Sequence, residues 1–356
     1  MGTRVPGARC GYGCRVNIIE RSARAVDRYQ RDHRFVAFPF AVVKKFGDDD
    51  GGRLAGLIAY YGFFSLFPLL LVFVSVLGFV LSSHPHLRAS LVDGALGQFP
   101  VIGNEIRSGA HVQGLHGNWW TIAIGGGTAI WAGLGVAQSA QFAMNIVWDV
   151  PRSRWPNFVF RRVRAVGVLA LLGAMVVGST LVSGYGSSGV LPAGLAFVGW
   201  LAALALNVAL FTVAFRILTT EDLRFGDVLP GAVVGAVLWT IVQALGGYYL
   251  THEIKNASDV YGAFALVIAL LVWIALGAQV MLLAAEVNVV RRRHLWPRSL
   301  VQPPLTAGDE RVYAAIVERA RMRPELAVRV WYPRSREERR RRRDRGREKQ
   351  PNEPAP

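Results

Sequence analysis

Polar side chains that could line a path through a membrane stand at helical spacing between positions 138 and 148. Gln138, Gln141, Asn145 and Trp148 follow one another at offsets of 0, 3, 7 and 10, which places them on one face of an α-helix. Amide groups in hydrocarbon need hydrogen-bond partners, so this face is expected to point into a helix bundle. It either lines a polar path or supplies interhelical hydrogen bonds that fix the fold, and the sequence leaves both interpretations open.

Further polar residues in the apolar segments are candidate partners for this face. They are Asn207, Gln243 and Gln279. Glu286 follows Gln279 by seven residues and shares its helix face. Because Glu286 stands near the end of its segment, we expect it to pair with the arginines at 291–293 or at 161–162. It then either locks the helix end or acts as a gate or a substrate contact.

Residues that could bind a metal or carry out catalysis do not form a recognisable pattern. The histidines of one polar loop are His84, His86, His111 and His116, and no acid stands at ligand spacing beside the first pair. We expect them to be solvated. Cys10 and Cys14 lie in a Gly-rich leader, where reduced thiols are expected. The sequence contains no P-loop, G-x-S-x-G or paired-carboxylate signature, so it predicts no catalytic residue, no cofactor and no metal.

A long apolar segment at 54–82 indicates the membrane helices that would position these polar residues. It contains no Asp, Glu, Lys or Arg, and as a helix it can cross a hydrocarbon core of about 30 Å. Pro68 lacks a backbone donor and is expected to kink this helix. Ser65 is expected to bond to the carbonyl group that Pro68 leaves free, as hydroxyl side chains do in membrane helices.

Similar apolar segments recur along the chain and predict an all-α, polytopic membrane protein with six transmembrane helices. The predicted spans are 54–82, 119–148, 165–186, 190–215, 228–250 and 260–290. Residues 1–53 form an N-terminal region whose segment 35–46 is expected to lie in the headgroup layer. Residues 291–356 form an Arg-rich tail, largely disordered, with a short amphipathic helix expected at 309–322.

The basic residues predict the orientation of this bundle. On the six-span arrangement, 37 of the 40 Lys and Arg residues fall on one side, and only Arg88, Arg107 and Lys255 fall on the other. The short loops alone favour the same side by 7 to 3. Loops rich in Lys and Arg stay in the cytoplasm, so both termini are predicted to be cytoplasmic.

The expected partners follow from this placement in a lipid bilayer. Residues 334–349 contain ten Lys and Arg residues against four acids, and beside a membrane such a segment binds anionic lipid headgroups. No specific nucleic acid is expected, although the net charge of the chain is +16. A homo-oligomer is compatible with the sequence.

Three separated motifs carry a resemblance to a known family. They are Tyr60–Leu70 (YYGFFSLFPLL), Gln141–Trp148 (QFAMNIVW), and the pair Val260–Phe264 (VYGAF) and Ala284–Asn288 (AAEVN). In this order they resemble the YihY / virulence factor BrkB family of bacterial inner-membrane proteins, over about residues 20–295. Ala285 stands where the family usually has Gly. The resemblance implies a six-helix inner-membrane bundle, and it brings no settled biochemical activity.

These observations favour a non-enzymatic role in transport or in the cell envelope. A bundle with a neutral polar interior would pass, or help to insert, a lipid-like or small polar molecule. No predicted span carries a charged residue at mid-depth, which weighs against a proton-relay antiporter. The alternative is a structural or partner-binding scaffold, and the tRNA-processing ribonuclease of the old family name is the least favoured. A cavity lined by Gln138, Gln141 and Asn145 would favour transport, and a packed, dry interior a scaffold.

Overall fold

The computed structural model describes residues 18–80, 119–157, 159–167, 193–252, 262–302, 305–323, 325–328 and 330. All regular secondary structure in these ranges is helical, which confirms the predicted all-α class. The loop histidines, Cys10, Cys14 and the basic segment 334–349 lie outside the described residues.

Five long helices form the body of the part of the chain that the structure describes. They are α3 (Gly51–Val80), α6 (Trp119–Val147), α8 (Ala193–Leu218), α9 (Phe225–His252) and α10 (Gly262–Arg292). Each has 26 to 31 residues, which at about 1.5 Å per residue is enough to cross a bilayer core. Three windows in the described part are also apolar enough to do so: Leu201–Leu218, Phe225–Gly246 and Val267–Arg292. The number of six spans stays a prediction, because most of 165–186 lies outside the described residues.

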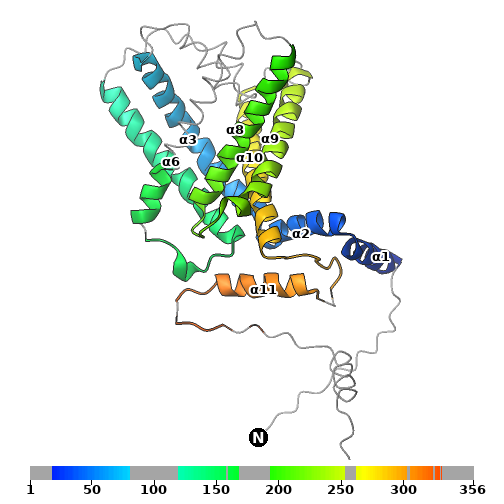
Figure 1. The fold of residues 1–356 in the computed structure, drawn as a ribbon. Coiled ribbons are helices and arrows are strands. Elements are labelled where there is room, and N and C mark those ends of the chain that lie inside the picture. Colours follow the sequence, from blue (N-terminus) through cyan, green and yellow to red (C-terminus); the bar gives the residue numbers. More distant parts are fainter. Residues whose placement is uncertain are drawn as a thin grey trace, which may run out of the picture.

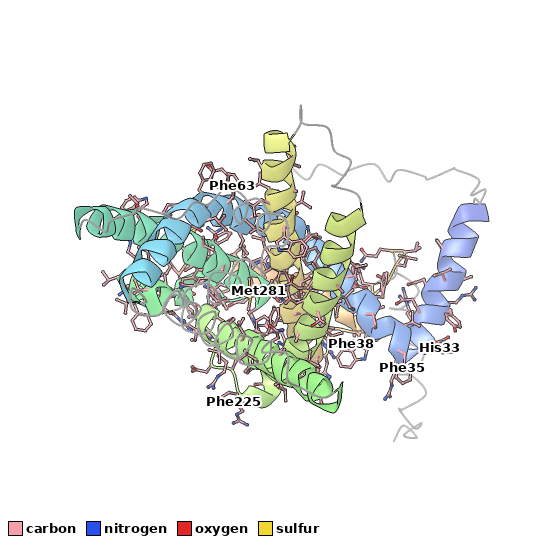
Figure 2. The ribbon with its side chains drawn as sticks, turned by 90° about the horizontal axis from the view of Figure 1, so that it is seen from above. His33, Phe35, Phe38, Phe63, Phe225 and Met281 are labelled. Carbon is pink, nitrogen blue, oxygen red and sulfur yellow. The ribbon has the colours of Figure 1, made fainter. Side chains whose placement is uncertain are left out.

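The long helices form two groups that meet at one end. Figure 1 shows α3 with α6 on one side, and α8 with α9 and α10 on the other, converging near α2 and diverging away from it. The central helix is α10, which packs against α3, α6, α9 and α2. Seen from above, Met281 of α10 lies near the middle of the bundle and Phe35 of α2 at its edge (Figure 2).

Shorter helices lie across the end where the two groups converge, called here the α2 end. They are α1 (Ile18–Asp32), α2 (Arg34–Asp48) and α11 (Ala307–Arg319) (Figure 1). Helix α2 covers the segment 35–46 that was predicted to lie in the headgroup layer, and that membrane position stays a prediction. The described part of the Arg-rich tail is folded, since Leu295 and Val312 are buried in the apolar core.

Among the side chains that the structure describes, the apolar core lies at the α2 end. It takes residues from the first turns of α3 and α9, from the last turns of α6 and α8, and from the second half of α10. Helices α9 and α10 approach closely at Gly231 and Gly235, as the G-x-x-x-G spacing suggests. A Cβ atom added at Gly231 would lie 2.1 Å from the carbonyl oxygen of Ala284, so a glycine is required there.

Helix α3 continues through Pro68 to Val80. The Ser65 hydroxyl, which is buried, donates to the carbonyl of Gly62 at 2.9 Å. It therefore does not bond to the carbonyl of Phe64, the group that Pro68 leaves without an N–H donor. The expected role of Ser65 is corrected here, because an i−3 carbonyl lies closer to a helical serine hydroxyl than the preceding residue's carbonyl. The kink at Pro68 stays a prediction.

Candidate functional site

A single buried ammonium group stands at the centre of a charge cluster at the α2 end. Lys45 of α2 is fully buried, and its Nζ lies 2.5 Å from Asp49 Oδ2, 3.3 Å from Asp149 Oδ2 and 3.6 Å from Glu286 Oε2. Nζ also donates to the carbonyl of Val147 at 3.1 Å. One side chain thus connects the ends of α2 and α6 with the interior of α10.

Two arginines complete this arrangement. Arg319 of α11 lies 2.7 Å from Asp49 Oδ1 and 3.3 Å from Asp149 Oδ1, and Arg293 lies 3.4 Å from Asp149 Oδ2. Three carboxylates therefore face three cations, and the formal charges balance. We call this set the Lys45 cluster; its members are Lys45, Asp49, Asp149, Glu286, Arg293 and Arg319.

The cluster is assembled at the places where helices stop. Lys45 and Asp49 are one turn apart at the end of α2, so both face the same side. Asp149 follows the end of α6 with a φ of 51°, and Asp50 and His294 have φ values of 57° and 52° just beyond α2 and α10. A residue in this left-handed region ends a helix and turns the chain, and Asp tolerates it better than most side chains. The three turns bring Asp49, Asp149 and Arg293 to one point.

The charges shift one another's proton affinity. Burial alone lowers the pKa of Lys45, but Glu286, Asp149 and Asp49 outweigh it, so the pKa lies above its ordinary value and the amine stays protonated. Burial raises the pKa of Asp149 above its usual range, although Lys45, Arg293 and Arg319 oppose this shift. Taking ions out of water costs several kcal/mol each, and mutual attraction repays it only with good geometry.

Glu286 is the least satisfied member of the cluster. Its side chain is fully buried, neither carboxylate oxygen has an N–H or hydroxyl donor among the described residues, and the carboxylate of Asp49 lies close to it. Its ion pair is with Lys45, and the expected partners at 291–293 and 161–162 are corrected. Arg292 and Arg293 instead pair with Asp227 at 3.8 Å and with Asp149, because α10 carries them past the level of Glu286. A buried carboxylate held by a single, long ion pair is a candidate for ligand exchange or protonation.

A second charged set lies beside the first and differs in its bonding. Asp309 of α11 accepts from Arg298 Nε at 2.7 Å and from the hydroxyls of Ser299 and Thr306 at 2.5 and 2.7 Å. Burial raises the pKa of Asp309, but the hydrogen bonds from Ser299, Arg298 and Thr306 outweigh it and hold this pKa well below its usual range. Arg298 also binds Asp48 at 2.7 Å. We call this set the Asp309 clamp. It joins α2 and α11 to the segment between α10 and α11, which carries Arg298 and Ser299.

The predicted polar face of α6 divides into three different environments. Asn145 is buried, and its Oδ1 accepts from the N–H and the hydroxyl of Thr220, in the loop before α9, at 3.1 and 2.9 Å. Gln141 is buried, with no described partner for its Nε2. Gln138 is half-buried and lines a groove of about 390 Å³ beside α3. The structure therefore places one of the three residues in a fold contact and one on an open surface.

The other predicted polar residues, Asn207, Gln243 and Gln279, are half-buried along α8, α9 and α10. The Oδ1 atom of Asn145 accepts from Thr220, in the loop after α8, and the expected pairing of the amides with Asn207, Gln243 and Gln279 stays a prediction. Asn288, which was not singled out as a site, accepts from the Gly231 N–H at 2.6 Å. Sequence reasoning also missed Lys45, Asp49 and Asp149, for which the i, i+4 spacing of the first two was the only signal.

Metal binding finds no support within the described ranges, where no group of three His, Cys, Asp or Glu side chains is placed to hold an ion. The mixed charges of the Lys45 cluster agree with this, since a buried lysine competes with a cation for the same carboxylates.

Comparison with known proteins gives the family. Residues 42–304 match the virulence factor BrkB family, which is most of the chain. The chain belongs to this family. The BrkB match includes α2 from Val42 onward, the long helices and the segment that carries Arg298, so it covers every residue of the Lys45 cluster except Arg319.

Two relatives of this BrkB-family chain are named as membrane proteins, and a third is named as a ribonuclease-like protein. It is 27% identical over 247 residues to a UPF0761 membrane protein of Pseudoalteromonas atlantica, covering 66% of this chain and 79% of the relative. It is 24% identical to the UPF0761 membrane protein VV0203 of Vibrio vulnificus, covering 79% and 91%. It is 22% identical to the putative ribonuclease-like protein YfkH of Bacillus subtilis, covering 68% and 90%. No solved structure matches the chain.

These comparisons establish a membrane protein of a family that is not a known enzyme family. The ribonuclease name is attached to one relative and is only weakly indicated for the family.

Proposed function

We propose that this BrkB-family protein has a non-enzymatic transport role in the bacterial cell envelope, in which the helix bundle passes or helps to insert a lipid-like or small polar molecule. The observation that supports it is the Lys45 cluster, whose lysine and three carboxylates are buried where the two groups of long helices converge. Ionisable residues buried in a membrane bundle are costly, and they usually mark a substrate path or a moving part.

The cluster acts in this proposal as a gate at the α2 end. Lys45 ties α2 to α6 through Asp149 and to α10 through Glu286. Separation of the two helix groups requires these ion pairs to part. Glu286 has no hydrogen bond to lose, so it can leave Lys45 for a polar group of the substrate more easily than Asp49, which Lys45 and Arg319 both hold.

The position of the cluster distinguishes a gate from a proton relay. Its members lie at the ends of α2, α6 and α11, in the last two turns of α10 and directly after α10, and no described residue of α6 or α10 continues the chain of charges toward the far end. A neutral polar interior with a charged gate therefore replaces the wholly neutral interior that the sequence suggested. The α2 end faces the cytoplasm in this proposal, because its loops hold almost all of the basic residues.

The experiment that tests the role uses a deletion strain complemented with Glu286→Gln. Lipid and metabolite profiles are compared with those of the wild-type protein and of Glu318→Gln, a control that neutralises a glutamate at the surface of α11. We expect Glu286→Gln to reach the membrane at normal levels and to fail in complementation. If Glu286→Gln were inserted normally and complemented as well as the wild type, Glu286 would not act as a gate.

A structural scaffold is the second candidate, and two contacts favour it. The hydrogen bonds from Thr220 to Asn145 and from Gly231 to Asn288 fix helix positions without leaving polar atoms for a substrate. In a scaffold, Asn145→Leu lowers folding stability and function together, whereas Glu286→Gln leaves function intact. Measuring protein level and complementation for both variants separates the two candidates. A ribonuclease activity remains the least favoured, and tRNA cleavage by the purified full chain would support it.

A further inference from the structure

The groove beside Gln138 lies on the outer side of the α3–α6 pair and has a distinctive lining. Its volume is about 390 Å³, and its walls come from α3, from the part of α6 between Trp131 and Phe142 and from the helical residues 159–167. The apolar and aromatic lining residues are Leu57, Tyr61, Trp131, Leu134 and Phe142. The polar lining residues are Gln138, Ser139, Arg161 and Arg162. A groove with apolar walls and two cationic side chains suits an amphipathic, anionic ligand.

The positions of these residues along α6 give the groove a depth in the membrane. Phe142 stands five residues before the end of α6, and Trp131 stands sixteen before it. At about 1.5 Å per residue, the groove runs from about 8 Å to about 24 Å from that end of the helix. The arginines lie in the helical segment that follows α6, toward the α2 end. With the end of α6 at the headgroup layer, as the proposed topology has it, the arginines stand at headgroup depth and Trp131 at acyl-chain depth.

Arg161 is held in place and is unsatisfied. Three residues further on, Arg164 donates to the carbonyls of Arg216 at 3.1 Å and of Thr219 at 2.5 Å, which anchors the segment to the end of α8. Arg161 is half-buried, and its Nε is buried without a hydrogen bond to any described residue. A buried guanidinium nitrogen with no acceptor is costly, and a phosphate oxygen would remove that cost.

The amide of Gln138 adds a second polar group along the same wall. It makes no hydrogen bond to any residue that the structure describes, and it stands between the arginines and Trp131 on the helix. Trp131 is 76% exposed and Tyr61 is 40% exposed, so their rings form an open apolar surface that hydrocarbon would cover. An amide at this depth can reach the glycerol ester groups of a phospholipid whose phosphate lies at Arg161.

From this geometry we infer that the groove binds an anionic phospholipid of the cytoplasmic leaflet, with its phosphate at Arg161 and Arg162 and an acyl chain along Leu134 and Trp131. A free phosphate would use the arginines and leave the aromatic walls uncovered. A zwitterionic lipid would bring a third cation, its own ammonium group, beside the two guanidinium groups. The inference goes beyond the proposed transport role and stands whether or not that role is correct, because it concerns a different surface from the Lys45 cluster.

The test uses the full-length protein purified in detergent and measured by native mass spectrometry with added phosphatidylglycerol or phosphatidylcholine. We expect phosphatidylglycerol to bind more tightly, and Arg161→Gln with Arg162→Gln to weaken it by about fivefold or more per charge. The control is Arg154→Gln, which removes an exposed arginine from the same loop and leaves the groove lining unchanged. Equal weakening in the control and the double variant would mean general surface attraction and would overturn the inference.

A second variant keeps the test informative if the arginine changes disturb folding. Trp131→Ala removes an exposed ring and no charge, so the fold is expected to persist. It should weaken phosphatidylglycerol binding while the two arginines remain. If inorganic phosphate at equal concentration displaced the lipid completely, or if Trp131→Ala left binding unchanged, the groove would be an anion site and not a phospholipid site.

Discussion

The Lys45 cluster and the Asp309 clamp lie side by side at the same end of the molecule, and their central acids are bonded in opposite ways. Both oxygens of Asp309 accept hydrogen bonds, from Arg298 and Lys44 on one side and from Ser299 and Thr306 on the other. Neither oxygen of Glu286 accepts one from a described residue. Both side chains are fully buried, so burial alone does not distinguish them. The two acids differ in the number of hydrogen bonds that their carboxylate oxygens accept. This number separates a structural contact, at Asp309, from a contact that can exchange partners, at Glu286.

The difference has an energetic meaning. Removal of Asp309 leaves several donors without an acceptor, and each such donor carries a desolvation penalty. Neutralisation of Glu286 removes one of three attractions on Lys45 and leaves no donor unpaired. The clamp is therefore expected to matter for stability, and Glu286 for activity.

The largest expected effect is on the centre of the cluster. Lys45→Met leaves three buried carboxylates around an apolar side chain, so we expect a loss of about 3–5 kcal/mol in the free energy of unfolding. The amount of folded protein in the membrane and its thermal unfolding in detergent measure this loss. Arg53→Met, at an exposed position in the first turn of α3, serves as the control and should cost much less. Similar losses for both variants would contradict the central role of Lys45.

Asp309→Asn is expected to have the next largest effect. The Asn side chain places an NH2 group, with two N–H donors, where a carboxylate oxygen of Asp309 accepted hydrogen bonds. The fully buried Arg298 also loses a charged partner. We therefore expect a loss of about 2–3 kcal/mol in the free energy of unfolding. Thermal unfolding of the purified protein checks this value. Glu310→Gln, one residue further on the exposed side of α11, is the matched control. An effect no larger than that of the control would show that the hydrogen bonds seen at Asp309 contribute little.

The pH dependence of the clamp provides a third comparison. The pKa of Asp309 is lowered in the folded protein, so its stabilisation is complete above the unfolded value of about 4 and is lost as the pH falls through the folded value. The raised pKa of Lys45 acts in the other direction: its stabilisation is complete below about 10 and is lost only as the pH rises through the folded value. Unfolding midpoints of the wild type and Asp309→Asn should therefore converge as the pH falls below 4. Parallel curves would contradict the assignment.

The smallest expected effect on stability is that of Glu286→Gln. The side chains have nearly the same shape and Lys45 keeps Asp49 and Asp149, so we expect a change of about 1 kcal/mol or less. If the proposed gate is correct, complementation is nevertheless lost. The contrast with Asp309→Asn sharpens the comparison, because that variant should lose stability first. A loss of stability from Glu286→Gln as large as from Asp309→Asn would place both residues in the same structural class.

The helical class could be predicted because long runs without charges leave no other structure for a backbone in a membrane. The ion-pair partners of Lys45 at the α2 end could not be predicted from the sequence. The pair Lys44 and Lys45 reads in the sequence as the charged end of an interfacial segment, and only the return of α10 and α11 across that end buries the second of them. Burial of a lysine depends on contacts over 100 or more residues, which periodicity does not encode.

The polar face of α6 shows the same limit at the level of single residues. Periodicity places Gln138, Gln141 and Asn145 on one side of the helix, and it predicts nothing about what stands opposite each of them. Asn145 accepts a hydrogen bond from Thr220 in a loop, and Gln138 lines a groove. Each residue therefore meets a different neighbour, and one face serves more than one purpose.

The helix ends marked by Asp50, Asp149 and His294 have a consequence for the register of the whole bundle. Insertion of one residue before Asp149 would turn the end of α6 by about 100° and move it by about 1.5 Å, which takes its carboxylate away from Lys45. The same insertion near the start of α6 would leave the spacing between Asp149 and the last turns of α6 unchanged. The three carboxylates around Lys45 therefore fix the register in which α2, α6 and α10 meet.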